Sequence, residues 1–478
     1  MGNALFKLKN PKHTVLLDKL QELIAKTFWK EKVFIVGGFV RDGLLGRDIK
    51  DINVVVQGNS CASGFAEWFA IRNGNFVEAK NPSYVGNGTY KYTFSDSELD
   101  GIELIITDTH RTRFSPSSSV AIRQGCSIEE DAKDRDLTIN SLYYDVTTGG
   151  IKTMSGSGIF DLHKRILRSP SSNIEESFKN DPVRMLRIIR FSSELKWGID
   201  KDTWVAIVKN ASLIENASYK RIREELNKIL LTEQPSFGIQ KLFYSGLAQY
   251  FIQDINDLNE VEECAYPRVT VFEQTMDILD YTQPILEHRL AALFHGVGKI
   301  ISESQNFFCH NIIGAECADA DLKILGYESD IRKEVRKAIE CYLLFDNFRN
   351  NDIPSTHKVR SFVELCGEMN VPTTLDLMHA YNCNKVYNRK PQLVPSIIKK
   401  IEEINNVDKK EKEKESKSLP VDGYDIMKTF GLKPSSLVGT LMSHVRRFCK
   451  TKPDATRDEC LEMLRQYVPA TAEARHSQ

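Results

Sequence analysis

The sequence predicts an α+β fold in which a small mixed sheet within the first 150 residues is followed by helices. Runs rich in β-branched and aromatic residues, each bounded by turn residues, predict strands at 32–38, 52–56, 91–95 and 101–107. From about residue 175 onward, apolar residues instead recur every three or four positions, which is the period of an amphipathic helix. The chain has 478 residues, enough for several domains.

Helical spacing also predicts a helix over 14–30, in front of the first strand, and another over 61–74, between the second and third strands. The clearest later helices cover 181–195, 220–231, 288–298 and 330–344. A run of alternating charge at 409–417 has no apolar stripe. Such a run is typical of a linker or of a solvated helix extension.

The composition excludes several classes of protein. The formal net charge is −1, so a nucleic-acid partner needs local basic patches rather than a global cationic field. Ten cysteines without a CxxC pair argue against a zinc ribbon or a disulfide framework and for a reducing compartment. No apolar run approaches the roughly 20 residues that a membrane-spanning helix needs, so we expect no membrane partner.

We expect a cytoplasmic monomer, with a nuclear or mitochondrial location left open.

Residues 36–46 follow a predicted strand and contain paired glycines. Gly37 and Gly38 let backbone amides approach a phosphate closely, and the start of the next helix favours an anion. Arg41 lies in that helix. A tight turn without a ligand is the alternative interpretation.

Oxygen ligands for a divalent metal occur on two of the predicted strands. Asp51 and Asn53 stand two apart, on one face of a strand, and Glu103 lies on a later strand that we expect beside it. Mg²⁺ prefers hard oxygen ligands, usually one or two carboxylates together with substrate phosphates. Asn53 offers only a neutral carbonyl oxygen. Three interpretations stay open: a metal-dependent enzyme with an unusual ligand, an enzyme that has lost its metal, and an ordinary strand.

Two further segments, 134–145 and 180–191, combine charged and amide side chains. Their polar residues are Arg135, Asp136 and Asn140 in the first and Asp181, Arg184, Arg187 and Arg190 in the second. Asp181 and Arg184 stand three apart at a helix start, so an acceptor and a bidentate donor lie side by side. Such a pair can satisfy the hydrogen-bonding edge of a nucleobase. The alternatives are a salt-bridged edge and a capped helix with solvated arginines.

In order and spacing, these segments resemble the motifs of the class II tRNA nucleotidyltransferases, the CCA-adding enzymes, in the nucleotidyltransferase/poly(A) polymerase family. The similar strings are GGFVRDGLLGRDIKDIN for the metal-binding motif A, RDLTINSLYYD for motif B, GGIKTMSGSGIFDLHKRILRSP for motif C, NDPVRMLRIIRFSSEL for motif D and KRIREELNKILL for motif E. The resemblance implies a small mixed-sheet nucleotidyltransferase head followed by an all-helical neck, body and tail. The implied ranges are 1–148, 149–231, 232–405 and 406–478.

The resemblance implies template-independent addition of CCA to the 3′ end of tRNA, with CTP and ATP as substrates and two-metal Mg²⁺ chemistry. The implied metal ligands and catalytic residues are Asp51, Asn53 and Glu103. The implied triphosphate contacts are Gly37, Gly38 and Arg41, and the implied ribose and phosphate contacts are Arg135, Asp136 and Asn140. The implied base-selecting residues are Asp181 and Arg184, supported by Arg187 and Arg190.

The body, 232–405, resembles a degenerate form of a helical metal-binding domain. Gly296 follows His295 at the position where that domain has an aspartate. We therefore expect a metal-free body in which His295 and His310 are core or surface histidines. The segment 420–442 resembles the start of the tail in bacterial relatives. Its implied tRNA contacts are Arg446, Arg447, Lys450 and Lys452, for which a solvated helix face is the alternative.

Three positions depart from the motifs. Asn53 replaces an aspartate of motif A, and the lost charge should weaken metal binding and slow the reaction. Asp134 replaces the first arginine of motif B, which is unfavourable beside a triphosphate unless Arg135 neutralises it. Asn180 replaces the acidic residue before Asp181. The alternatives are a catalytically impaired or inactive tRNA-binding paralogue, an enzyme that adds only CC or only A, and a poly(A) polymerase, which the tail disfavours.

Overall fold

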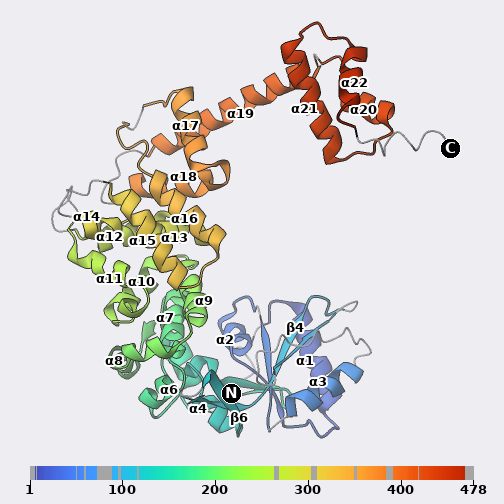
Figure 1. Ribbon diagram of the computed structural model, residues 1–478. Helices are drawn as coiled ribbons and strands as arrows, with labels where there is room; N and C mark the ends of the chain where they lie inside the picture. The colour runs from blue at the N-terminus through green and yellow to red at the C-terminus, as the bar shows by residue number, and fades with distance from the viewer. Residues whose placement is uncertain are drawn as a thin grey trace. The chain divides into compact units, whose positions relative to one another are not determined.

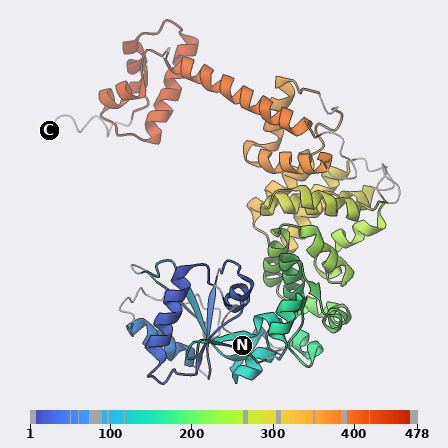
Figure 2. The same cartoon turned by 180° about the vertical axis from the view of Figure 1, so that it is seen from behind.

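The computed structural model describes residues 6, 8–49, 51–58, 61–72, 89–94, 98–115, 118–154, 156–262, 269–302, 309–348, 352–383, 391–417 and 419–468. The chain divides into two compact units, Met1–Phe348 with Val363–Pro391 and Arg349–Phe362 with Gln392–Gln478. No helix in the described ranges is long and apolar enough to cross a membrane. Figures 1 and 2 show strands mainly in the N-terminal part of the first unit and helices in most of the remaining chain.

The N-terminal part of the first unit is built on a six-stranded sheet with the strand order β3-β4-β2-β1-β7-β8. The strands are β1 (Val33–Val36), β2 (Ile52–Val56), β3 (Tyr90–Thr93), β4 (Glu103–Asp108), β7 (Leu142–Asp145) and β8 (Gly150–Thr153). Strands β2 and β4 are parallel and the other neighbours are antiparallel, so the predicted mixed sheet is confirmed. A hairpin of β5 (His110–Ser115) and β6 (Ser118–Gly125) forms a separate sheet that we did not predict.

The two faces of the six-stranded sheet have different surroundings. The helices involved are α1 (Pro11–Ile24), α3 (Cys61–Arg72) and α4 (Ile128–Lys133). Because strand side chains alternate, Val33 and Ile35 join the large core with α1 and α3, whereas Phe34 and Val36 join a smaller core with α4. Figure 1 shows α1 and α3 against the sheet. Asn53 pairs with Val36 on β1 and thus lies on the less covered face.

Helix α1 is shorter than the predicted 14–30. It begins at Pro11, after Asn10 whose side-chain oxygen accepts a 3.0 Å hydrogen bond from the Lys12 N–H. It ends at Ile24, where the Thr27 hydroxyl donates to the Ile24 carbonyl at 2.9 Å and the chain turns. The prediction beyond Ile24 is wrong because this local turn competes with the helix.

Helices make up most of the first unit beyond the sheet, as predicted. They are α5 (Gly158–Lys164), α6 (Ile174–Asn180), α7 (Val183–Leu195), α8 (Lys201–Lys209), α9 (Tyr219–Leu230), α10 (Pro235–Tyr244), α11 (Gln253–Asp257), α12 (Val271–Tyr281), α13 (Leu286–Phe294), α14 (Gly298–Ser302), α15 (His310–Ile324), α16 (Ser329–Cys341) and α18 (Val371–Cys383). A short parallel pair, β9 (Ile166–Leu167) and β10 (Gly198–Ile199), lies among them. Helix α7 packs against α9 and α10, so the segments that resemble motifs D and E lie against each other.

The two histidines of the helical body are core residues. His295 is fully buried, its Nδ1 donates to the Ala292 carbonyl at 2.8 Å, and burial lowers its pKa to about 3. His310 is also buried, with its Nε2 2.9 Å from the Tyr342 hydroxyl. A Cβ at Gly296 would lie only 2.9 Å from Val271 Cγ1, so an aspartate there would not fit without a shift of its neighbours. Within the described residues, no cluster of three or more His, Cys, Asp or Glu side chains could hold a metal.

The second unit contains α19 (Leu393–Lys417), α20 (Gly423–Phe430), α21 (Ser436–Thr451) and α22 (Arg457–Arg465), and α17 (Thr356–Cys366) begins in it. The charged run 409–417 forms the end of α19. It is therefore a helix extension and not a linker without regular structure. Helices α20, α21 and α22 share a small apolar core that includes Ile426, Leu441 and Leu464.

Candidate active site

A cavity of about 1010 Å³ in the first unit gathers most of the predicted site residues. The predicted residues that line it are Gly37, Gly38, Arg41, Asp51, Asn53, Arg135, Asp136, Asn140, Asp181, Arg184, Arg187 and Arg190. They come from segments separated by up to about 150 positions, so the fold brings them together from distant parts of the chain. Glu103 does not line the cavity.

The paired glycines precede and open α2 (Gly38–Leu45), directly after β1. Gly37 has a φ of +77°, a backbone conformation that L-residues with a Cβ rarely adopt. No atom lies within 4 Å of the position of a Cβ at Gly37, so the need for glycine comes from the backbone and not from crowding. The first N–H groups of a helix have no partner within it, and this helix start lines the cavity. It therefore suits an anion.

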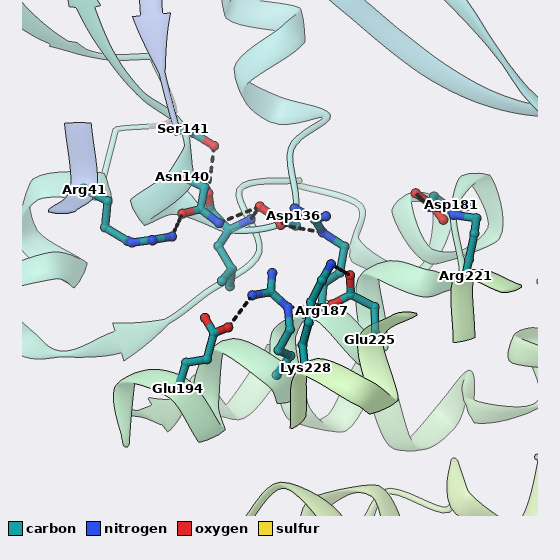
Figure 3. Close-up of polar contacts among 12 residues, drawn as sticks. Arg41, Asp136, Asn140, Ser141, Asp181, Arg187, Glu194, Arg221, Glu225 and Lys228 are labelled. Carbon is teal, nitrogen blue, oxygen red and sulfur yellow. Dashed lines mark hydrogen bonds and ion pairs between the residues drawn. The ribbon is translucent and has the colours of Figure 1, made fainter. Parts of the chain in front are cut away.

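Arg41, on α2, is engaged by two side chains. Its Nε and Nη2 donate to the two carboxylate oxygens of Asp42 at 3.0 and 2.7 Å. Its Nη1 donates to Asn140 Oδ1 at 2.8 Å (Figure 3). Arg41 thus joins the glycine turn to the segment that resembles motif B.

The candidate metal ligands lie at the start of β2 and β4. Asp51 is exposed, and no hydrogen bond or ion pair to its carboxylate occurs within the ranges that the structure describes. Asn53 pairs with Ile105 across the parallel strands, and continuing this register places Asp51 beside Glu103. The Glu103 carboxylate, however, lies 2.7 Å from Lys91 Nζ. Asp51 and Asn53 therefore present hard oxygen donors to the cavity, whereas Glu103 is paired with a lysine.

Asp136 is the centre of a hydrogen-bond network that connects the segment between α4 and β7 to α7. Arg187 donates to Asp136 Oδ2 through Nε and Nη2, at 2.8 and 2.5 Å. Asn140 Nδ2 and the Leu137 N–H donate to Oδ1, at 3.0 and 2.8 Å (Figure 3). Burial alone raises the pKa of Asp136, but the charge of Arg187 and these hydrogen bonds outweigh it and hold the pKa well below its usual range.

Arg135 forms a second network, on α4 and β7. Its Nε donates to Asp131 Oδ2 at 3.0 Å and to the Tyr143 hydroxyl at 2.9 Å, and the Tyr143 hydroxyl donates to the same Asp131 oxygen at 2.5 Å. Burial raises the pKa of Asp131, but the charges of Arg135 and His110 lower it below its ordinary value. Arg135 is therefore the counter-ion of Asp131.

Asp134 is paired with Arg184 and not with the adjacent Arg135. Asp134 Oδ1 lies 3.1 Å from Nη2 of Arg184, whose Nη1 donates to Ser177 Oγ at 2.6 Å. Arg135 Nε is directed to Asp131, so it is Arg184 and not Arg135 that offsets the charge of Asp134. The candidate base-selecting arginine thus has an acidic neighbour from the C-terminal cap of α4.

The candidate base-selecting carboxylate, Asp181, is also partnered. Its Oδ1 accepts from the Val183 N–H at 3.2 Å, which places it at the entrance to α7. Its Oδ2 accepts from Arg221 Nη2 on α9 at 2.8 Å (Figure 3). Asp181 and Arg184 therefore both line the cavity, each with its own counter-ion.

Arg190 is held on α7 by several contacts. Its Nε donates to Glu225 Oε2 at 2.6 Å and its Nη1 to Glu194 Oε1 at 2.8 Å (Figure 3). Its guanidinium lies 3.9 Å from the centre of the Phe191 ring, and Lys228 Nζ donates to the other Glu225 oxygen at 2.9 Å. These contacts connect α7 to α9, which fits a supporting role for Arg190.

Several cavity residues were not predicted: Arg221, Asp131 and Lys228 line it, and Tyr143 and Glu225 support it. The segment 220–231 was identified as similar to motif E, and its mix of acidic and basic residues at helical spacing was the available signal. The separation of Arg221 from Asp181, 40 positions, gave no local cue to their pairing.

The basic residues of the tail lie in the second unit. Arg446, Arg447 and Lys450 are exposed on α21 and Lys452 follows its end. Lys452 Nζ lies 2.6 Å from Glu459 Oε1, which neutralises part of its charge.

Two family models match the chain. One, described as the poly A polymerase head domain, matches residues 33–168 and thus covers the sheet and the cavity residues from Gly37 to Asn140. The other, described as a probable RNA- and SrmB-binding site of polymerase A, matches residues 198–258.

Related proteins match most of the chain. It is 25% identical to a CCA-adding enzyme of Ligilactobacillus salivarius over 90% of each chain. It is 23% identical to the mitochondrial CCA tRNA nucleotidyltransferase of Candida glabrata over 91% of this chain and 90% of the other. The fold is similar to that of the Bacillus stearothermophilus CCA-adding enzyme in complex with CTP, with a TM-score of 0.54, 19% identity and coverage of 96% and 99%.

The family models, the relatives and the fold agree with the motifs around the cavity. The chain therefore carries the head domain and the RNA-binding region described by the poly A polymerase models, and it resembles the CCA-adding enzymes over about 90% of its length.

Proposed function

We propose that this chain adds CCA to the 3′ end of tRNA from CTP and ATP without a nucleic-acid template. The main support is the single cavity that gathers a glycine turn, two metal-type oxygen donors and the Asp181/Arg184 pair. Relatives over 90% of the chain are named as enzymes of this activity. The tRNA 3′-hydroxyl would attack the α-phosphate and release pyrophosphate.

We further propose a cytoplasmic monomer, with a nuclear or mitochondrial location left open since two relatives are named mitochondrial.

Base selection would follow from the chemistry of Asp181 and Arg184. Cytosine and adenine both carry an exocyclic amino group beside an unprotonated ring nitrogen, whereas uracil and guanine carry a carbonyl beside an N–H. A carboxylate accepts from the amino group and a guanidinium donates to the ring nitrogen, so the same pair suits C and A and rejects U and G. Arg187 would keep Asp136 ionised and in place for the ribose.

Phosphate binding would be shared by the start of α2 and the surrounding arginines. Gly37 and Gly38 place backbone N–H groups at the cavity, where they suit the triphosphate. Arg41 and Asn140 are already joined by a hydrogen bond, so their positions are set before substrate binds.

The residues present fit a Mg²⁺ site of reduced charge. Asp51 and the Asn53 carbonyl oxygen would hold the ion, and Glu103 would join only if it left Lys91. When bound, the metal lowers the pKa of the attacking hydroxyl and neutralises charge on the leaving group. The amide at Asn53 supplies no charge, so we expect a slow enzyme.

The test is primer extension on a tRNA that ends at its discriminator base and on a tRNA that already ends in CC. Labelled CTP, ATP or both are supplied with Mg²⁺, and Asn53→Asp is compared with the unaltered chain. The loss of one electrostatic contact to a transition state typically costs about 10²–10³-fold in kcat, so Asn53→Asp should be faster by about that factor. Asp48→Asn, a matched change at an exposed cavity carboxylate paired with Lys9, is the control and should change little.

Each outcome separates the alternatives. Addition of C, C and A by the unaltered chain supports the proposal, whereas addition from only one nucleotide identifies a CC-adding or A-adding enzyme. Activity only in Asn53→Asp identifies an impaired enzyme. No incorporation by either chain, with tRNA still bound, refutes catalysis and identifies an RNA-binding paralogue.

Binding of tRNA by the tail has its own test. Arg446→Ala and Arg447→Ala should each lower the salt dependence of tRNA affinity by about one unit of slope, because each would remove one phosphate contact. Lys452→Ala should have a smaller effect, since Lys452 is paired with Glu459. Unchanged slopes for both arginine variants contradict the proposed tail contacts. Arg465→Ala, on α22, serves as an exposed control.

A further inference from the structure

The candidate base-selecting arginine is held by two side chains outside its own helix. Arg184 is only 5% exposed, its Nη2 lies 3.1 Å from Asp134 Oδ1, and its Nη1 donates to Ser177 Oγ at 2.6 Å. Both terminal nitrogens of the guanidinium thus have a partner. A buried guanidinium needs such partners because its desolvation is costly without a counter-charge.

Other nearby carboxylates are committed elsewhere. Asp181 accepts from Arg221 and from the start of its own helix. Asp136 accepts from Arg187, and Asp131 accepts from Arg135. Among these carboxylates, Asp134 is the one within ion-pair distance of Arg184.

Asp134 is also one of the positions at which the chain departs from its motifs. It carries a negative charge where motif B has an arginine, and Asn180, just before Asp181, is neutral where motif D has an acidic residue. The carboxylate next to Arg184 therefore comes from the cap of α4 and not from the helix that precedes α7.

We propose that Asp134 is a positioning residue that sets the orientation of Arg184 and so contributes to the choice of C and A over U and G. A fixed guanidinium presents its donors in one direction, whereas a free one can rotate to meet the carbonyl of a wrong base. The selectivity part of this inference rests on the proposed function, whereas the contact itself does not. Asp134 at this place is then a requirement of base selection and not a defect near the phosphates.

The first measurement tests the contact without turnover. Phenylglyoxal modifies exposed arginines, and mass spectrometry reports the modification at Arg184 in the full-length chain. We expect Arg184 to react at least several-fold faster in Asp134→Asn than in the unaltered chain. Asp134→Glu should restore protection, and Glu129→Gln, an exposed carboxylate on the same helix, should change nothing. An unchanged rate at Arg184 in a folded Asp134→Asn chain overturns the inference.

The second measurement tests selectivity by equilibrium binding of CTP and of UTP. Loss of a charge-assisted hydrogen bond should lower the preference for CTP by about 10- to 100-fold in Asp134→Asn. In an Arg184→Ala background the same substitution should have no further effect, because Asp134 acts through Arg184. An equal loss of affinity for both nucleotides, or an additive loss in the double variant, overturns the selectivity role.

The two measurements also separate this inference from the proposed function. A chain that binds neither nucleotide, with Arg184 protected by Asp134, overturns the proposed function and with it the selectivity role, while the positioning contact stands. A chain that adds CCA but whose Asp134→Asn variant keeps full selectivity overturns the inference alone.

Discussion

Removal of Arg187 tests the network on which the candidate ribose site depends. Arg187→Ala deletes two of the four hydrogen bonds to the Asp136 carboxylate and leaves those from Asn140 and the Leu137 N–H. Breaking a buried ion pair costs about 3–5 kcal/mol because an uncompensated charge stays buried. The Asp136 side chain is 6% exposed but that of Arg187 is 38% exposed, so we expect the lower end, about 3 kcal/mol near neutral pH.

The pH dependence of this loss follows from the pKa of Asp136. In the unaltered chain that pKa is held below its unfolded value, so the stabilisation is present at neutral pH and is lost as the pH falls through the folded pKa. Without Arg187, burial dominates and raises the pKa of Asp136, so the variant carboxyl takes up a proton on acidification. The free-energy difference between the two chains should therefore shrink from about pH 7.5 to about pH 5.

Hydrogen exchange in low urea measures this effect locally. A chain with two compact units need not unfold in one step, so the opening free energy is best followed in peptides from 134–145. Arg47→Ala is the matched control, because Arg47 lines the same cavity but is 48% exposed and 4.0 Å from Asp42. Its loss should be below about 0.5 kcal/mol. A loss below about 1 kcal/mol for Arg187→Ala, or one that grows on acidification, refutes the reasoning.

Two further predictions concern the backbone and a buried carboxyl. Gly37→Ala should lower the free energy of unfolding by about 1–2 kcal/mol, because Gly37 has a φ of +77°. Gly38→Ala should change it little, because Gly38 has an ordinary φ and a Cβ there would lie 3.7 Å from the nearest side-chain atoms. Equal effects of the two substitutions in urea denaturation would contradict a backbone cause. Burial, helped by the charge of Asp254, raises the pKa of Asp321 to about 7, above its ordinary value of 3.8. The stability contributed by the protonated carboxyl is full below about pH 4 and is lost as the pH rises through about 7, so Asp321→Asn should be the more stable chain at about pH 8. Thermal unfolding measured from about pH 4 to about pH 8 checks this prediction. Asp330→Asn is the control and should bring no gain in stability at pH 8, because the Asp330 side chain is 98% exposed.

Secondary structure was largely predictable because its signals are local. The predicted strand at 52–56 coincides with β2, and the helical periods beyond residue 175 correspond to real helices. The predictions were wrong where short-range bonds compete, as at Thr27, which ends α1 at Ile24. The hairpin of β5 and β6 was not predicted because the segment 107–125 lacks a clear alternation of apolar and polar residues.

The candidate site was predictable only as a set of residue types. Periodicity and motif order indicated which residues belong together, and the cavity gathers all the predicted nucleotide-handling residues. Glu103 was different, since its strand position was foreseeable but its ion pair with Lys91 on the neighbouring strand was not. Strand pairing is a long-range property, so the sequence of β4 alone does not reveal which side chain faces Glu103.

By itself, the sequence indicated the resemblance to the CCA-adding enzymes, the mixed sheet, the helices and the list of candidate residues, because periodicity and motif spacing are properties of short segments. Only the tertiary structure decided which charges are paired. Asp136 meets Arg187 across 51 positions, Asp181 meets Arg221 across 40, and Asp134 meets Arg184 in place of the adjacent Arg135. An ion pair depends on distance in space and on burial, and both are set by how α7 packs against α9 and by where the cap of α4 lies.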